Sequence, residues 1–118
     1  MADIDEREIL VNKEKNRLKR LFKGIPPNKL KVVEGLIIQA ARLRVLLDEM
    51  WIDISENGDY ELFSQSDKAE PYERERPVAR FYNTRDQSYQ RIIKQLTDLL
   101  PEGSNKKEIK KYSASDLI

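Results

Sequence analysis

The chain has 118 residues, about the size of one domain, and its apolar and charged fractions are 39% and 36%. Neither cysteine nor histidine occurs. Their absence excludes disulfide bonds, zinc sites built on thiolate or imidazole, and Ser–His or Cys–His nucleophiles. The first ten residues, MADIDEREIL, lack the apolar core of a signal peptide, and the apolar-rich run 32–41 is too short to span a bilayer. We therefore expect a soluble intracellular protein.

The net charge of +1 conceals two blocks of opposite sign. Residues 12–31 contain eight Lys or Arg and one acid, Glu14, which gives a net charge of +7. Residues 48–75 contain ten Asp or Glu and two cations, which gives −8. Such blocks steer different partners or pair subunits head to tail, although two solvated faces of a charged protein give the same pattern.

The basic block begins in an amphipathic segment that predicts a helix over about residues 5–23. Its acids gather at the N-terminal end and its cations at the C-terminal end, as the helix dipole favours. Gly24 and the pair Pro26-Pro27 end the segment. The cations are candidate contacts for DNA phosphates, and a basic surface without a ligand is the competing interpretation. The candidate DNA-binding residues are Lys13, Lys15, Arg17, Lys19, Arg20, Lys23, Lys29 and Lys31.

The strongest periodic pattern predicts a long second helix, from an N-cap at Asn28 to about Ser55. One apolar stripe steps by three and four residues, and a second stripe lies beside it. Because one helix covers only one stripe, a second packing partner is expected, with a neighbouring subunit as one source. The first stripe comprises Val33, Leu36, Ala40, Leu43, Leu47, Met50 and Ile54, and the second Leu30, Ile37, Ala41, Val45 and Ile52.

A turn at Asn57-Gly58 follows, and then a segment containing Tyr60, Leu62 and Phe63 that either packs back on the helices or forms a short strand. Residues 64–76 are polar and interrupted by proline, which predicts a loop. A third helix is expected over about 77–100, with Pro77 at its first position and Pro101 as its stop. Its buried stripe is predicted to comprise Val78, Phe81, Arg85, Tyr89, Ile92, Leu96 and Leu99.

These elements predict an all-α fold: a basic N-terminal helix followed by a long antiparallel helical hairpin, in a single domain over residues 1–103. Residues 104–118 form a charged tail for which disorder is the favoured interpretation. The apolar faces are expected to serve the core or assembly into a multimeric ring. The residues predicted to carry these roles are Leu36, Leu43, Leu47, Phe81, Tyr89, Ile92 and Leu96.

No catalytic residue, metal site or cofactor is predicted, because the four glycines are isolated and the carboxylates fall on polar positions. A non-enzymatic protein is therefore expected. Two further classes stay open beside a DNA-binding assembly protein: a small helical DNA-binding regulator acting as a dimer, and an oligomeric adaptor that works without DNA.

The third-helix segment contains a Pro-Val pair, an aromatic-Asn step, a Tyr and a Lys-x-Leu-x-x-Leu-Leu-Pro ending. In this chain they are Pro77-Val78, Tyr82-Asn83, Tyr89, Lys94, Leu96, Leu99-Leu100 and Pro101. This pattern resembles the small terminase subunits of tailed bacteriophages. The stretch LFKGIPPNKLKVVEGLIIQAARL, residues 21–43, is similar to the upstream part of those short helical proteins, and the resemblance covers roughly residues 18–101.

The resemblance implies a non-catalytic subunit that forms rings, holds double-stranded viral DNA, and regulates or recruits the large terminase subunit during genome packaging. Its place would be the cytoplasm of the infected bacterial host, and the tail from Lys106 to Ile118 would dock on the large subunit. The chain lacks the separate N-terminal helix-turn-helix domain of many members, which puts sequence-specific DNA recognition in doubt.

Overall fold

The computed structural model describes residues 3–101 and is mainly helical, as predicted. A small two-stranded sheet is added to the expected helices. In chain order the elements are α1 (Ile4–Leu21), the 3₁₀ turn η1 (Pro27–Lys29), α2 (Leu30–Asn57), β1 (Tyr60–Phe63), β2 (Tyr72–Glu75) and α3 (Pro77–Asp98). The predicted tail, residues 104–118, lies outside the described residues.

The ends of α1 follow from local hydrogen bonding and charge. The Asp3 side chain caps the helix by accepting a hydrogen bond of 2.8 Å from the backbone N–H of Glu6. Cations fill the last turn, where they complement the helix dipole. The helix ends at Leu21, two residues before the predicted end, and Phe22 and Ile25 in the connection that follows are buried.

The boundaries of α2 differ from the prediction at both ends. Asn28 does not cap the helix, because it lies inside η1, and α2 begins at Leu30 without a side-chain cap. The helix continues to Asn57, where the N–H of Gly58 donates to the carbonyl of Ile54 at 2.8 Å. Gly58 has a φ of 82° and a ψ of 172°, a backbone conformation reserved almost entirely for glycine, which makes it an efficient stop.

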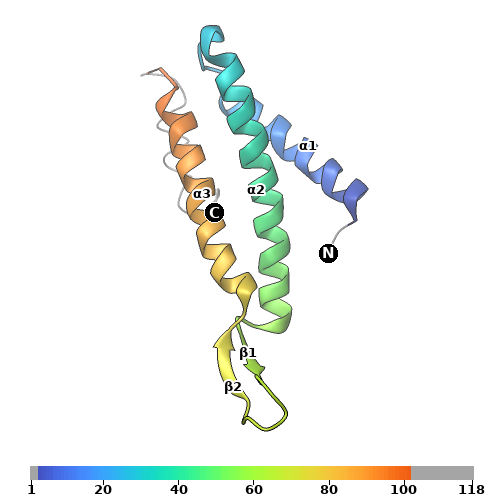
Figure 1. Cartoon of the computed structure of the whole chain (residues 1–118). Helices are drawn as coiled ribbons and strands as arrows, with labels where there is room; N and C mark the ends of the chain where they lie inside the picture. Colours follow the sequence, from blue (N-terminus) through green and yellow to red (C-terminus); the bar gives the residue numbers. More distant parts are fainter. Residues whose placement is uncertain (1–2, 102–118) are drawn as a thin grey trace.

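The segment predicted as a loop over residues 64–76 contains the second strand of a β-hairpin. β1 and β2 pair antiparallel, with Tyr60 opposite Glu75 and Phe63 opposite Tyr72. The paired residues are far apart in the sequence. The polar, proline-interrupted run 64–76 therefore gives no local sign that part of it forms a strand. This hairpin projects past the ends of α2 and α3 (Figure 1).

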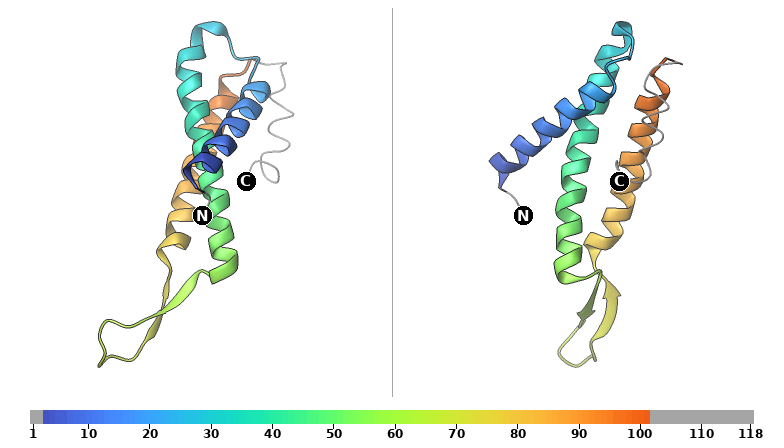
Figure 2. Two further views of the ribbon diagram at one scale, coloured as in Figure 1. Left: turned by 90° about the vertical axis from the view of Figure 1, so that its right-hand side faces the viewer. Right: turned by 180° about the vertical axis from the view of Figure 1, so that it is seen from behind.

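The three helices do not pack equally along their lengths. α2 and α3 lie side by side and run in opposite directions, while α1 packs across α2 with its C-terminal half and leans away toward its N-terminus (Figures 1 and 2). The result is an elongated molecule of 63 × 29 × 21 Å. Its core therefore lies toward the end where all three helices meet.

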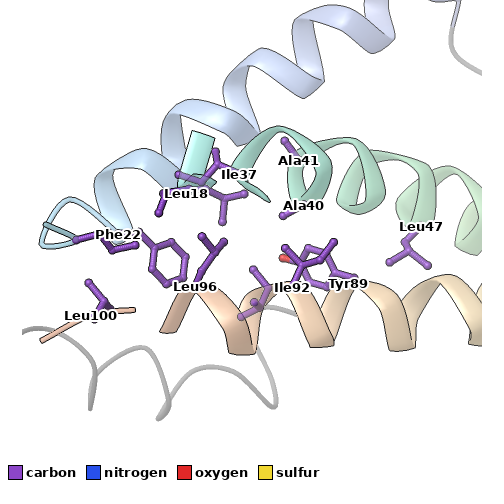
Figure 3. Close-up of a cluster of buried hydrophobic side chains, with 13 residues drawn as sticks. Leu18, Phe22, Ile37, Ala40, Ala41, Leu47, Tyr89, Ile92, Leu96 and Leu100 are labelled. Carbon is purple, nitrogen blue, oxygen red and sulfur yellow. The ribbon is translucent and has the colours of Figure 1, made fainter. Parts of the chain in front are cut away.

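The core shows how the two apolar stripes of α2 are covered. Ala40 points toward α3 and Ala41 toward α1 (Figure 3). The second stripe thus finds its partner within the same chain over Ile37 to Val45, so no neighbouring subunit is needed there. The core comprises Leu18, Phe22, Ile25, Val33, Ile37, Ala40, Ala41, Leu47, Tyr89, Ile92, Ile93, Leu96 and Leu100.

Candidate functional site: a groove between the first helix and the helix pair

An open groove of about 1130 Å³ lies where α1 leans away from the other helices. α1 forms one wall, the C-terminal half of α2 forms the other, and the first turns of α3 contribute at one end. Its apolar lining includes Leu10, Val45, Met50, Ile52 and Phe81. Leu10, Ile52 and Phe81 are exposed, so the groove offers apolar surface to a partner.

Polar side chains lie where this groove meets the core, and we call Glu14, Arg17 and Arg44, which line the groove, together with the core residue Tyr89 the polar layer. Arg17 Nε donates to Glu14 Oε1 at 2.8 Å, and its Nη2 donates to the same oxygen. The hydrogen bond to Glu14 raises the pKa of Arg17. The polar layer interrupts the apolar contacts of α1 with the core, because Glu14 and Arg17 stand between Val11, which is half-buried against the core, and the buried Leu18.

Tyr89 occupies the centre of the polar layer and is fully buried. Arg44 Cζ lies 5.1 Å from the centroid of the Tyr89 ring, a cation–π distance. Burial raises the pKa of the Tyr89 hydroxyl, partly offset by the charges of Arg44 and Arg17. Burial is the largest single influence on Arg44 and lowers its pKa, but the charge and hydrogen bond of Asp48, 2.9 Å from Arg44 Nη2, together with Tyr89 and Tyr82, make the net direction upward.

Most acids along the α2 wall are already paired. Glu49 Oε2 lies 3.1 Å from Arg7 Nη2, which ties the N-terminal half of α1 to α2 across the groove. Asp53 pairs with Arg76 at 3.0 Å, and Asp48 with Arg44. Within residues 3–101, Glu56 is the groove acid that has no such partner.

The cations of the α1 wall are less constrained. Lys13 and Arg20 line the groove, are exposed, and pair with no carboxylate in the described part of the chain. Arg85 reaches the groove from α3, with its Cζ 5.1 Å from the centroid of the Phe81 ring. The groove therefore combines an apolar floor with free positive charge on the α1 side.

The eight predicted DNA-binding residues do not form one surface. Lys13, Arg17 and Arg20 line the groove. Lys15 and Lys19 occupy the other flank of α1, since successive residues of a helix are separated by 100°. Arg17 is half-buried and engaged with Glu14, so it is a poor phosphate contact. The other three cations surround the turn between α1 and α2 and are exposed: Lys23, Lys29 and Lys31.

The predicted core or assembly residues also divide. Leu36 and Leu43 are half-buried against the core, whereas Phe81 is 43% exposed and borders the groove. Phe81 departs from the predicted buried stripe because it lies in the first turns of α3, beyond the reach of α1. The fully or nearly buried members are Leu47, Tyr89, Ile92 and Leu96.

Sequence reasoning missed the groove and the second strand of the β-hairpin, whereas β1 was one of the two alternatives for residues Tyr60 to Phe63. Tyr60, Glu61 and Leu62 alternate between apolar and charged residues, as a strand with two different faces does, but YERE has a single apolar residue and gives no such signal. The groove has no comparable signal, because it depends on the angle at which α1 crosses α2.

Within residues 3–101, no cluster of three acidic side chains could hold a metal ion. None of the helices described combines the length and apolarity needed to cross a membrane. Comparison with protein-family models, with curated proteins and with solved structures finds no match to this chain.

Proposed function

We propose that the chain is a non-catalytic small terminase subunit of a tailed bacteriophage. In this role it assembles into a ring, holds double-stranded viral DNA, and regulates or recruits the large subunit in the cytoplasm of the infected host. The resemblance of residues 18–101 supports the family. One observation carries the proposal: the exposed cations of α1 have no carboxylate partners within residues 3–101.

The flank of α1 that carries Lys15 and Lys19 supports DNA binding. These residues are one helical turn apart, so their side chains point the same way, about 6 Å apart along the helix axis. Neither lies in the groove, and neither forms an ion pair in the described part of the chain. A row of lysines of this kind contacts phosphates without reading the base sequence.

Assembly is supported by apolar side chains that are exposed near the end of the α2–α3 pair from which the β-hairpin projects. Trp51 and Ile52 are exposed on α2, and the Trp51 ring lies 5.8 Å from the ring of Tyr82 on α3. Large apolar groups gathered at one end of a small protein mark an interaction surface. In the proposed ring, the antiparallel pair of α2 and α3 forms the rigid body of each subunit.

The DNA-binding part is tested with the variant Lys15→Glu/Lys19→Glu and labelled duplex DNA, by fluorescence anisotropy over a range of salt concentrations. We expect affinity to fall at least about tenfold, and the slope of log affinity against log salt to decrease by about 2. The control variant Lys15→Arg/Lys19→Arg keeps the charge and should bind as the unchanged protein does.

The mass in solution, measured by light scattering after size exclusion, separates the competing functions. Loss of DNA binding with an unchanged multimeric mass supports the proposal. Unchanged DNA binding would contradict it, and an adaptor that works without DNA would explain a multimer that binds no duplex at all. A dimer that binds DNA would favour the small regulator.

A further inference from the structure

The β-hairpin has one satisfied face and one open face. On the satisfied face, Arg74 pairs with Glu61 at 2.8 Å and its Cζ lies 3.5 Å from the centroid of the Phe63 ring. The Phe63 and Tyr72 rings meet edge to face at 5.9 Å. The charged and aromatic side chains of this face therefore contact one another within the hairpin.

The open face consists of Tyr60, Leu62, Glu73 and Glu75, and we call it the open hairpin face. Tyr60 lies opposite Glu75 and Leu62 opposite Glu73, and alternate residues of a strand share one side of the sheet. Leu62 is 73% exposed and Tyr60 57%. Neither glutamate forms an ion pair within residues 3–101. The surface thus presents two apolar side chains beside two free negative charges.

Hydrogen bonds of Arg76 join the base of the hairpin to the end of α2. Arg76 Nη1 donates to the Gly58 carbonyl at 2.6 Å, and its Nη2 bonds Asp53 at 3.0 and 3.2 Å. The Arg76 backbone N–H donates to the Asp59 carbonyl at 2.8 Å. These bonds hold the hairpin pointing past the helix ends, away from α1 (Figures 1 and 2).

The groove has the complementary chemistry. It exposes apolar side chains of α1, α2 and α3. Within residues 3–101 its charges without an ion-pair partner include Lys13 and Arg20 on the α1 wall and a single acid, Glu56, on the α2 wall, so positive charge is in excess. Two glutamates beside two apolar side chains match two cations beside an apolar floor. Matching charge at the rim of an apolar contact fixes the register of a complex and excludes wrong partners.

We propose that the groove of one copy of this chain receives the open hairpin face of a second copy. The proposal rests on the assembly part of the proposed function and names the two surfaces that make the contact. Each copy carries one groove and one hairpin, so the contact is heterologous and repeats around a closed ring when the rotation allows closure. In this arrangement the two flanks of α1 have different roles: the groove flank serves assembly and the other flank binds DNA.

Charge reversal with rescue tests the contact, with mass measured by light scattering after size exclusion. We expect Lys13→Glu/Arg20→Glu and Glu73→Lys/Glu75→Lys each to raise the apparent dissociation constant between subunits at least about tenfold, because like charges then meet. The protein carrying all four changes should regain the mass of the unchanged chain. An equimolar mixture of the two double variants should also assemble, because every contact between unlike copies is again complementary.

Lys15→Glu/Lys19→Glu is the matched control, since it makes the same change of charge on the other flank of α1, and its mass should not change. All four changed side chains in the tested contact are exposed, so circular dichroism should show the same helicity and thermal unfolding. A multimer unaffected by either double reversal would overturn this contact and leave the assembly function intact. So would dissociation that the four-fold variant fails to repair. A chain that stays monomeric at every concentration would overturn the assembly function itself, and this contact with it.

Discussion

The two halves of α2 carry the same pattern of apolar stripes but pack against different neighbours. Over Ile37 to Val45 the helix is enclosed, with α3 on one side and α1 on the other. Over the last two turns α3 and the hairpin base are its neighbours, and Ile52 on the second stripe is exposed. The apolar stripe continues through both halves, so its burial is decided by where α1 lies and not by α2 itself.

The direction of α1 is in turn decided by its own charged residues. Leu18 packs in the core, whereas Arg17, the residue before it, and Glu14, one turn before it, belong to the polar layer. The ion pair between Arg7 and Glu49 links α1 to α2, whereas Glu14 and Arg17 pair within α1. An enclosed half therefore gives the protein its stability, and an open half gives it a surface for partners.

The largest expected effect is on stability, and it comes from comparing one residue of the second stripe in each half of α2. Ile37 is 4% exposed and Ile52 is 56% exposed. We expect Ile37→Ala to lower the free energy of unfolding by about 2–5 kcal/mol, because it leaves a cavity between α1 and α2. Ile52→Ala should change it by less than about 0.5 kcal/mol. Urea unfolding followed by circular dichroism measures both.

Equal losses at the two positions would contradict the comparison, because they would mean that the open half is covered in solution. Protein concentration distinguishes the reason. If Ile52→Ala destabilises only at concentrations where the chain is multimeric, then a second copy covers that half of α2. The difference between the enclosed and the open half of α2 would then exist in the single chain but not in the assembly.

The sequence predicted the helices well, and the physical reason is that their signals are local. Periodicity, prolines and the stop at Gly58 act within a few residues, and the expected ranges 5–23, 28–55 and 77–100 lie within a few residues of those observed. The predicted N-cap failed at Asn28 because two preceding prolines direct the chain into a 3₁₀ turn first. A short strand at Tyr60 to Phe63 was one of two alternatives, but its pairing with β2 was missed because the partners stand up to 15 residues apart.

The candidate site was less accessible to sequence reasoning. Tyr89 was predicted as a core residue and is buried, but nothing in its periodicity showed that two arginines would surround it. Arg17 was predicted to contact phosphate, although its carboxylate partner three residues earlier was visible in the sequence. The groove depends on a crossing angle between helices, a property of the assembled fold that no single segment contains.

A smaller effect is expected from the polar layer that divides the two halves. Glu14→Ala removes the partner of a half-buried arginine beside Tyr89, and we expect a loss of about 1 kcal/mol in the free energy of unfolding. Asp48→Ala is the matched change, because Asp48 also pairs with an arginine of this layer but is largely exposed. It should cost less than about 0.5 kcal/mol.

Thermal and urea unfolding of the two variants measure this difference. If Asp48→Ala costs as much as Glu14→Ala, the burial of the polar layer does not set the strength of its ion pairs. The outcome sharpens the comparison, because the polar layer is where enclosed packing gives way to the open groove.

The smallest effect concerns the hairpin base at the far end of the open half. Hydrogen bonds from Asn57, at 2.7 Å, and from Arg76 lower the pKa of Asp53 below its ordinary value of 3.8. A carboxyl whose pKa is lower in the folded state stabilises the fold above its unfolded pKa, and loses that effect as pH falls through the folded value. The unchanged chain should therefore be more stable than Asp53→Asn near pH 7, and the gap should narrow below about pH 4.

Urea unfolding of both proteins between about pH 3 and pH 7 follows this gap. Asp67→Asn is the control, since the Asp67 side chain makes no hydrogen bond or ion pair within residues 3–101, and its stability should track that of the unchanged chain at every pH. A gap for Asp53→Asn that stays constant to about pH 3 would show that the carboxylate charge does not hold the hairpin base. The orientation of the hairpin would then rest on the Arg76 bonds to Gly58 and Asp59 alone, which do not titrate in this range.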